Sequence, residues 1–251
     1  MAYEVWPMSV FCSPNFVANG LVLCLDGANL RSWPGAGTTW YDVSGQYNTA
    51  TMFGSVPTSS DGGGCFDFAT ATGASSSVST LGFTFTSNMI PTTGSFTLSC
   101  WVKNAPASVG QCGLFSNAGG ANGYRFGVGL NAVYVLISGA NSEGYSEPQL
   151  AFTSTLSASL WYNVVTIFDR VGTNSSGVPQ WQLYLNGSYV TATNMVTPQT
   201  AATTTAAPGL VRSACCSVYT GKVAVMTAHN RALSANEISQ NYIALSSRFG
   251  L

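Results

Sequence analysis

The stretch that decides the fold is Ser95-Phe-Thr-Leu-Ser-Cys-Trp-Val-Lys103, which alternates apolar and polar residues along most of its length. Successive side chains of a β-strand point to opposite faces, so this alternation gives the segment one apolar face. That face carries Phe96, Leu98, Cys100 and Val102, while the other carries Thr97, Ser99, Trp101 and Lys103. We therefore predict a strand with one side in a hydrophobic core.

The same alternation recurs on both sides of this stretch. Gln180 to Leu185 ends at Asn186-Gly187, a pair that tolerates the positive φ values of a two-residue turn, so Ser188 to Thr193 is expected to return antiparallel. Further strands are predicted over Gly20 to Asp26, Tyr124 to Leu130, Ala132 to Ser138 and Trp161 to Asp169. Thr191 to Pro208 is rich in Ala and Thr and is predicted to be an extended loop.

One short helix is predicted near the C-terminus. Ser234 and Glu237 have the spacing of a capping box, with Leu233 and Ile238 at the positions of a hydrophobic staple. Ile238, Tyr242 and Leu245 then share one helical face, which we expect to pack on the sandwich.

Composition indicates a single large all-β domain with few charges. The chain has 251 residues, of which 27 are glycine, and only 7% are charged, against about 25% in an average soluble domain. A net charge of -1 disfavours nucleic acid and an anionic membrane as partners. We find no secretory signal and no run long enough to span a bilayer, and we therefore expect synthesis in a host cytoplasm.

Residues 1–19 are expected to form an arm in front of the domain of residues 20–251. The arm has prolines at positions 7 and 14, which interrupt strand pairing, and it carries four aromatic side chains: Tyr3, Trp6, Phe11 and Phe16. We expect these aromatics to form an assembly interface with a neighbouring subunit. The alternative is an arm that folds back on its own sandwich.

The seven cysteines form an odd, scattered set without CxxC spacing: Cys12, Cys24, Cys65, Cys100, Cys112, Cys215 and Cys216. This pattern favours neither a disulfide framework nor a zinc site. We expect mostly buried free thiols, with Cys24 and Cys100 packing as small hydrophobic residues within strands.

Several segments, in order, resemble the laminin G-like, concanavalin A-like jelly-roll family. They are Ser95 to Lys103, Trp161 to Asp169, Leu183 to Gly187, and an ending over Gly221 to Tyr242 that contains Asn230-Arg-Ala-Leu-Ser-Ala-Asn-Glu-Ile238. The resemblance covers roughly residues 20 to 245 and implies a two-sheet antiparallel jelly-roll sandwich. Gly20 to Asp26 and Thr38 to Gly45 also resemble versions of this domain encoded by tailed phages and large viruses.

No catalytic residue is expected. Related glucan hydrolases carry Glu-x-Asp-x-x-Glu along one strand, and this chain has no such run; Glu143 and Glu147 fall in a predicted loop. His229 is the only histidine, and we expect it to hydrogen-bond near the helix entrance.

No cofactor or metal is expected either, although the resemblance implies calcium as a frequent ligand. The place where the family carries acidic residues reads Gly221-Lys-Val-Ala-Val-Met226 here. A different calcium site would have to use Asp26, Asp42 or Asp61.

Exposed aromatic residues in loops are the expected glycan contacts, with Trp33, Trp40, Tyr41 and Tyr145 as candidates; the alternative is core packing. We predict a non-enzymatic structural virion protein, such as a capsid decoration, cement or head-surface component, in a homo-oligomer or array with other virion proteins. The alternative is a carbohydrate-binding adhesion module on a viral tail or fibre. A glucan hydrolase is the least favoured hypothesis.

Overall fold

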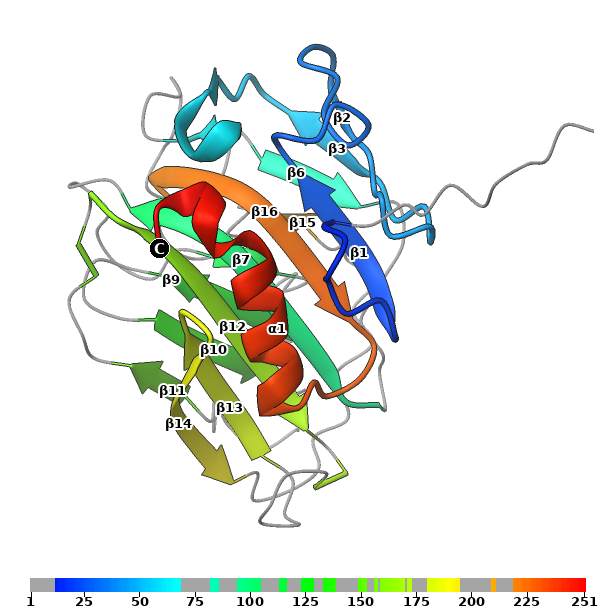
Figure 1. The fold of residues 1–251 in the computed structure, drawn as a ribbon. Helices are drawn as coiled ribbons and strands as arrows, with labels where there is room; N and C mark the ends of the chain where they lie inside the picture. The colour runs from blue at the N-terminus through cyan, green and yellow to red at the C-terminus, as the bar shows by residue number, and fades with distance from the viewer. Residues whose placement is uncertain are drawn as a thin grey trace, which may run out of the picture.

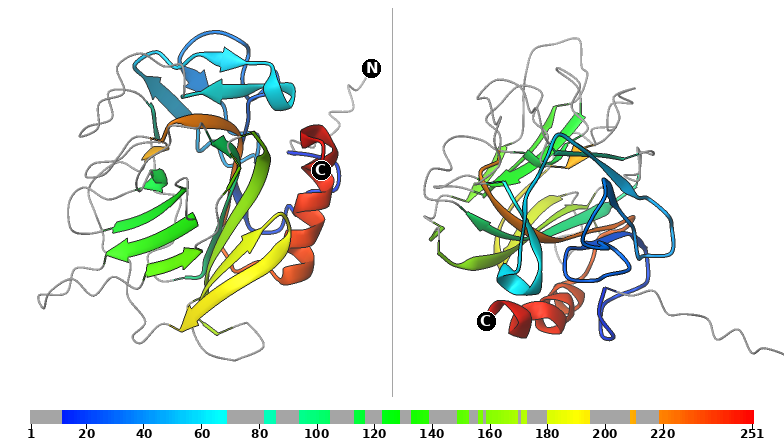
Figure 2. Two further views of the ribbon diagram at one scale, coloured as in Figure 1. Left: turned by 90° about the vertical axis from the view of Figure 1, so that its left-hand side faces the viewer. Right: turned by 90° about the horizontal axis from the view of Figure 1, so that it is seen from above.

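The protein is an antiparallel β-sandwich with one helix on its outer side (Figure 1). The computed structural model describes residues 12–68, 82–85, 94–104, 113–116, 123–128, 133–138, 149–152, 156–157, 159–169, 171–172, 180–194, 209–210 and 219–251. Figure 2 shows the two sheets as separate layers, with the helix against one of them. The predicted two-sheet fold with a short C-terminal helix is confirmed.

The first sheet contains the longest strands, and every pairing in it is antiparallel. Its order is β14 (Ser188–Asn194), β13 (Gln180–Leu185), β12 (Trp161–Asp169), β7 (Phe96–Asn104), β16 (Gly221–His229), β5 (Cys65–Asp67) and β4 (Thr58–Ser59). β1 (Leu21–Asp26) also pairs with β16. A single-turn 3-10 helix, η1 (Asp61–Gly63), connects β4 to β5.

The second sheet is built from shorter strands, which are also antiparallel. Its order is β11 (Gln149–Phe152), β10 (Val133–Ser138), β9 (Gly123–Val128), β8 (Gly113–Ser116), β15 (Gly209–Leu210), β6 (Gly82–Phe85), β3 (Ala50–Phe53) and β2 (Thr39–Trp40). The predicted pairing of the segments that become β9 and β10 is thus confirmed.

The main core lies between the two sheets. The apolar face predicted for β7 points into it, with Phe96, Leu98, Cys100 and Val102 all buried. Facing side chains from the second sheet include Phe83, Phe115 and Phe126. The predicted turn after β13 is also present, since Asn186 and Gly187 have φ values of 49° and 73°.

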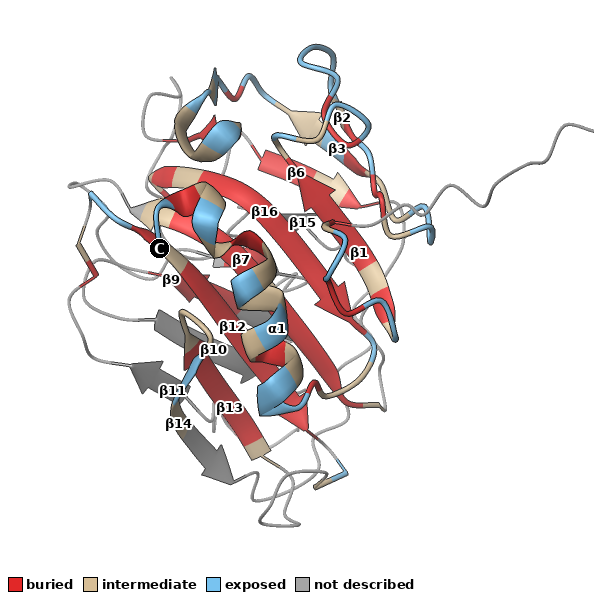
Figure 3. Cartoon of the chain, in the orientation of Figure 1, coloured by how far each residue is buried: buried red, intermediate tan, exposed pale blue. Residues whose placement is uncertain are grey.

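A second core explains why several strands of the first sheet are buried on both faces (Figure 3). Helix α1 (Ala235–Ser246) and the 3-10 helix η2 (Ser247–Phe249) lie across the outer face of this sheet. The Trp101 ring stacks on the rings of Phe249 and Tyr242, with centroids 4.1 and 5.7 Å apart. The helix begins with the predicted Ser234–Glu237 capping box and buries Ile238 and Leu245.

Residues 12–19 lie against the same outer face and the helix, which corrects the prediction that they reach out to a neighbouring subunit. The Val17 N–H donates to Asn241 Oδ1 at 2.8 Å, and the Ser13 hydroxyl donates to the Ala244 carbonyl at 3.2 Å. Phe16 is only 8% exposed, with its ring 6.1 Å from that of His229. Burial in its own domain removes Phe16 from the expected assembly contacts. The other three aromatics, Tyr3, Trp6 and Phe11, lie outside the described residues.

The cysteine prediction is wrong for Cys24, which forms a disulfide with Cys12. Their Cα atoms are 6.0 Å apart, a separation that disulfides commonly span, because residues 12–19 turn back beside β1. Cys65 and Cys100 are buried free thiols, as expected, and burial raises the pKa of Cys65 to about 11. Cys112, Cys215 and Cys216 lie outside the described residues. No helix among the described residues is long and apolar enough to cross a membrane.

Candidate functional site

Two of the four aromatics predicted to contact glycans belong to the core. Trp40 is fully buried and Trp33 is 7% exposed, and their rings lie 4.5 and 4.9 Å from that of Phe66. A sugar cannot reach rings packed in this way, so the prediction is corrected for both residues. Tyr145 lies outside the described residues, and Tyr41 is 46% exposed.

Tyr41 belongs to a well-anchored loop that also exposes Tyr47, a residue that sequence reasoning missed. The Asp42 carboxylate accepts hydrogen bonds from the backbone N–H groups of Cys24, Ser44 and Asn48 at 2.8 to 2.9 Å. Tyr47 is 84% exposed, with a positive φ of 60°. The loop therefore offers two accessible rings on a fixed backbone.

The three carboxylates considered for calcium already have hydrogen-bond donors or cations as partners. Asp42 holds the loop just described, and Asp26 Oδ1 lies 2.7 Å from Arg248 Nη1. Asp61 Oδ2 accepts from Lys222 Nζ at 2.9 Å and from Lys103 Nζ at 3.0 Å. Carboxylates committed to ammonium and guanidinium groups do not form a calcium site. Across the described ranges, no three His, Cys, Asp or Glu side chains are grouped to hold a metal.

Asp61 is instead an electrostatic link between η1 and three strands. Its second oxygen accepts from the Trp161 indole Nε1 at 3.0 Å. Burial alone would raise the pKa of Asp61, but the hydrogen bonds from Lys222, Lys103 and Trp161 outweigh it and hold the pKa well below its usual value. Lys222, which follows the glycine that opens β16, thus neutralises a carboxylate rather than leaving it for a metal.

His229 is buried and takes part in a hydrogen bond that holds the fold together. It is 1% exposed, and its Nε2 lies 2.9 Å from the Val17 carbonyl, so the neutral ring donates to the segment in front of β1. Burial lowers the pKa of His229, and the hydrogen bond with Val17 raises it. The effect of burial is the larger of the two, so the pKa is about 4. The expected hydrogen bond is present, although its partner is the N-terminal segment rather than the helix entrance.

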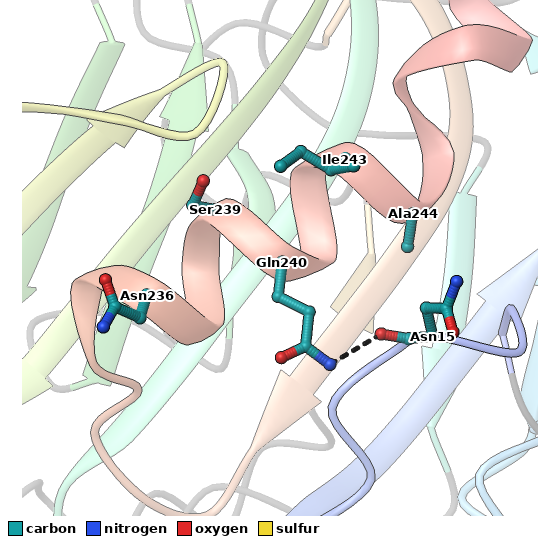
Figure 4. A pocket seen from close by; sticks show the side chains of 6 residues that line it. All are labelled: Asn15, Asn236, Ser239, Gln240, Ile243 and Ala244. Atoms are coloured by element: carbon teal, nitrogen blue, oxygen red, sulfur yellow. Dashed lines mark hydrogen bonds between the residues drawn. The ribbon is translucent and has the colours of Figure 1, made fainter.

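The concave surface we consider as the site lies between α1 and residues 12–19. We call it the α1 groove, and its volume is about 520 Å³. Figure 4 shows its lining side chains: Asn15, Asn236, Ser239, Gln240, Ile243 and Ala244. It is an open groove rather than an enclosed cavity.

Helix periodicity creates one wall of the groove. Residues three or four apart share a helix face, so Asn236, Ser239, Gln240 and Ile243 form a row on the side away from the buried Ile238 and Leu245. Ile243 is 67% exposed and is the apolar member of this row. The row is fixed because the opposite face of the same helix is packed on the sheet.

The other wall is Asn15, which is held in place from several directions. Its carbonyl accepts a hydrogen bond from Gln240 Nε2 at 2.8 Å, as Figure 4 shows. The neighbouring Val17 and Ser13 are bonded to Asn241 and Ala244, and Cys12 is tied to β1 through the disulfide. The two walls are more than 200 residues apart in the sequence and yet form one preorganised surface.

The groove lining contains no acid, base or nucleophilic thiol. Its polar groups are three carboxamides and one hydroxyl, which donate and accept hydrogen bonds without carrying charge. Such a surface can bind a ligand rich in hydroxyl groups, but the lining itself cannot supply general acid–base chemistry.

Comparison with known proteins places the chain in a family. The family model described as the concanavalin A-like lectin/glucanases superfamily matches residues 72–239. No curated protein sequence matches the chain.

Many solved structures have a similar fold. A botulinum neurotoxin DC binding domain in complex with SialylT is 14% identical with a TM-score of 0.66, and the match covers 91% of this chain and 52% of that chain. A structure concerning the interaction of botulinum neurotoxin type C with two ganglioside molecules is 13% identical with a TM-score of 0.66, with the same coverages of 91% and 52%.

The botulinum neurotoxin serotype G binding domain is 16% identical with a TM-score of 0.64, over 90% of this chain and 51% of that chain. The chain thus spans about half the length of these structures, and at such identities the likeness concerns the fold alone. Together with the family model, which matches well over half of the chain, it confirms the resemblance noted in the sequence: the protein belongs to the concanavalin A-like lectin/glucanases superfamily.

Proposed function

We propose that the protein is a non-catalytic carbohydrate-binding module and that the α1 groove holds the sugar. The observation that carries this proposal is an open, uncharged groove lined by Asn15, Asn236, Gln240 and Ser239. Sugar hydroxyls both donate and accept hydrogen bonds, and carboxamides do the same in a fixed plane. Proteins of similar fold interact with ganglioside or with SialylT, which is consistent with this role. The shared fold alone does not transfer those ligands to this chain.

The dimensions of the groove fit a small oligosaccharide. Its volume of about 520 Å³ lies within the range usual for small-ligand sites. The exposed Ile243 side chain offers an apolar contact for the C–H face of a pyranose ring. The groove thus combines the two kinds of contact that a sugar needs, polar groups for its hydroxyls and an apolar surface for its ring.

Affinity at a single groove is expected to be weak. Four hydrogen bonds of about 1 kcal/mol each and an apolar contact of similar size give roughly 4–5 kcal/mol, a Kd on the order of 0.2–1 mM. An open groove leaves much of the ligand in water, which keeps the gain small. Useful binding would therefore require several copies displayed together.

A glycan array tests the proposal, followed by titration of the best ligand with purified wild type, Asn236→Ala and Ile243→Ala. Each substitution removes about 1 kcal/mol and is expected to weaken binding about five-fold. The matched controls are Gln46→Ala, an exposed amide elsewhere, and Val171→Ala, whose side chain is 72% exposed outside the groove. Unchanged affinity in the groove variants, or equal losses in the controls, would refute the assignment.

A second proposal places the chain in a virus particle, as a decoration or cement subunit or on a tail or fibre. Its support is the low content of charged residues, 7%, which limits repulsion between packed copies. Exposed apolar side chains such as Leu30 and Val171 also favour contacts between copies. Sedimentation of the purified chain tests it, because an array subunit is expected to associate at high concentration. A strict monomer that is absent from purified particles would exclude the proposal.

A further inference from the structure

We infer that the α1 groove selects uncharged glycans and discriminates against sialylated ones, an inference that rests on the proposed function and names its ligand class. Three features of the described residues support it: the charge of the two walls, the pairing of the nearest cations, and the direction in which the Gln240 amide points.

The two walls are almost free of charge. Residues 12–19 contain no charged side chain, and α1 contains neither lysine nor arginine. Glu237, in α1, is the only charged residue in the two segments taken together. A sialic acid carboxylate in the groove would therefore have a negative side chain on the adjoining helix and no positive one.

Glu237 is ionised and its charge is already matched. Its carboxylate accepts from Arg231 Nη2 at 2.6 Å and from Arg231 Nη1 at 2.9 Å, and the hydrogen bonds with Arg231 lower the pKa of Glu237 to about 2 despite partial burial. Arg231 also donates to the Asn19 and Ala232 carbonyls. Four of the five N–H groups of this guanidinium are thus engaged, and an anion in the groove would have to compete with a bidentate ion pair for it.

Other cations of the outer face are committed in the same way. Arg248 pairs with Asp26 and donates to the Gly62 and Gly64 carbonyls. Lys103 and Lys222 share Asp61, as described above. Among the described residues, the charges on this side of the sandwich are therefore paired and do not form a positive field that would attract an anionic sugar.

The Gln240 amide adds a direct preference. Its nitrogen must point at the Asn15 carbonyl, because only the N–H side can donate to a carbonyl oxygen. The amide oxygen of Gln240 therefore points away from this carbonyl and can accept a hydrogen bond at the groove (Figure 4). A sugar hydroxyl can donate to this oxygen, whereas a carboxylate, which only accepts, would repel it.

The experiment compares lactose with sialyllactose as a matched pair, using wild type, Gln240→Lys and the control Gln46→Lys, each checked for folding by circular dichroism. For wild type we expect lactose to bind at least ten-fold more tightly than sialyllactose. The lysine at position 240 keeps a donor for the Asn15 carbonyl and adds a cation, so it is expected to reverse the preference, whereas the control leaves it unchanged.

The possible failures are distinguishable. Equal or tighter binding of sialyllactose by wild type overturns the inference but leaves carbohydrate binding in place. A preference that does not move in folded Gln240→Lys, or that moves equally in Gln46→Lys, shows that the α1 groove does not set the selectivity and also overturns the inference. If a full array and both sugars show no binding to folded protein, the proposed function fails, and the inference fails with it.

Discussion

Removing the disulfide between Cys12 and Cys24 should weaken the fold without abolishing it, and this prediction tests how the N-terminal wall of the groove is held. The substitution Cys12→Ser breaks the bond and leaves Cys24, which is fully buried, as a thiol in its original position. Cys12 itself is 8% exposed, so a serine there adds little further perturbation.

The magnitude follows from the length of the closed loop. The two cysteines are 12 residues apart, and for this separation the loss of chain entropy in the unfolded state corresponds to about 3 kcal/mol at 25 °C. The segment keeps other attachments, since the hydrogen bonds of Ser13 and Val17 contribute about 1 kcal/mol each and Phe16 stays buried. These contacts are expected to hold the segment in place, so the unfolding free energy falls while the groove remains formed.

Urea unfolding measures the effect in four samples, wild type and Cys12→Ser, each with and without dithiothreitol. Oxidised wild type is expected to be more stable than the other three by about 3 kcal/mol, and those three are expected to coincide. Equal unfolding free energies for oxidised and reduced wild type would refute the reasoning. So would quantitative alkylation of Cys12 in protein denatured without reductant, because the disulfide would then be absent.

Further predictions concern pH, packing and activity. The folded state holds the pKa of His229 near 4 against 6.5 in the unfolded chain, so the unfolded chain binds more protons between these values. Stability is therefore expected to fall by about 3 kcal/mol as pH drops from 6.5 to 4, and His229→Gln should flatten this dependence in urea titrations. Phe249→Ala removes a ring stacked 4.1 Å from that of Trp101 and is expected to cost about 3–5 kcal/mol in the same assay. Asp61→Asn weakens the pairing with two partly exposed lysines, so a loss of only about 1 kcal/mol is expected from melting curves. Incubation with β-glucans should release no reducing ends, and release that follows the purified chain would contradict a non-catalytic role.

The strands and the helix were predictable because their signals are local. The alternation in β7 specifies a face whatever surrounds it, and Asn186-Gly187 specifies a turn by its own φ preferences. The capping box at Ser234 and Glu237 is equally local, and it fixed the start of α1 correctly. Each of these elements is specified by residues that are close together in the sequence.

The site depended on contacts between distant segments, and here the sequence was a poor guide. Trp33 and Trp40 occur among turn-forming residues, which leaves both glycan contact and core packing open, but their rings pack against Phe66 of the first sheet. Phe16 and Cys12 were assigned to an outward arm because nothing nearby in sequence covers them; their partners are His229 and Cys24. Once the buried face of α1 is predicted, the exposed row on its other side follows by elimination. The opposite wall, Asn15, does not follow from any pattern in the sequence.

The position of the α1 groove along the sequence predicts which segments set the proposed sugar preference. The family model matches residues 72–239, a span that includes Asn236 and Ser239 but neither Asn15, Gln240 nor Ile243. Four of the six lining residues therefore lie outside the matched span. If the α1 groove holds the sugar as proposed, the ligand can change through residues 12–19 and the second half of α1 while the sandwich itself is kept. For this chain, the sugar preference should follow residues 12–19 and the second half of α1 when these are exchanged between relatives, while the exchange of loops between the sheet strands should leave it unchanged.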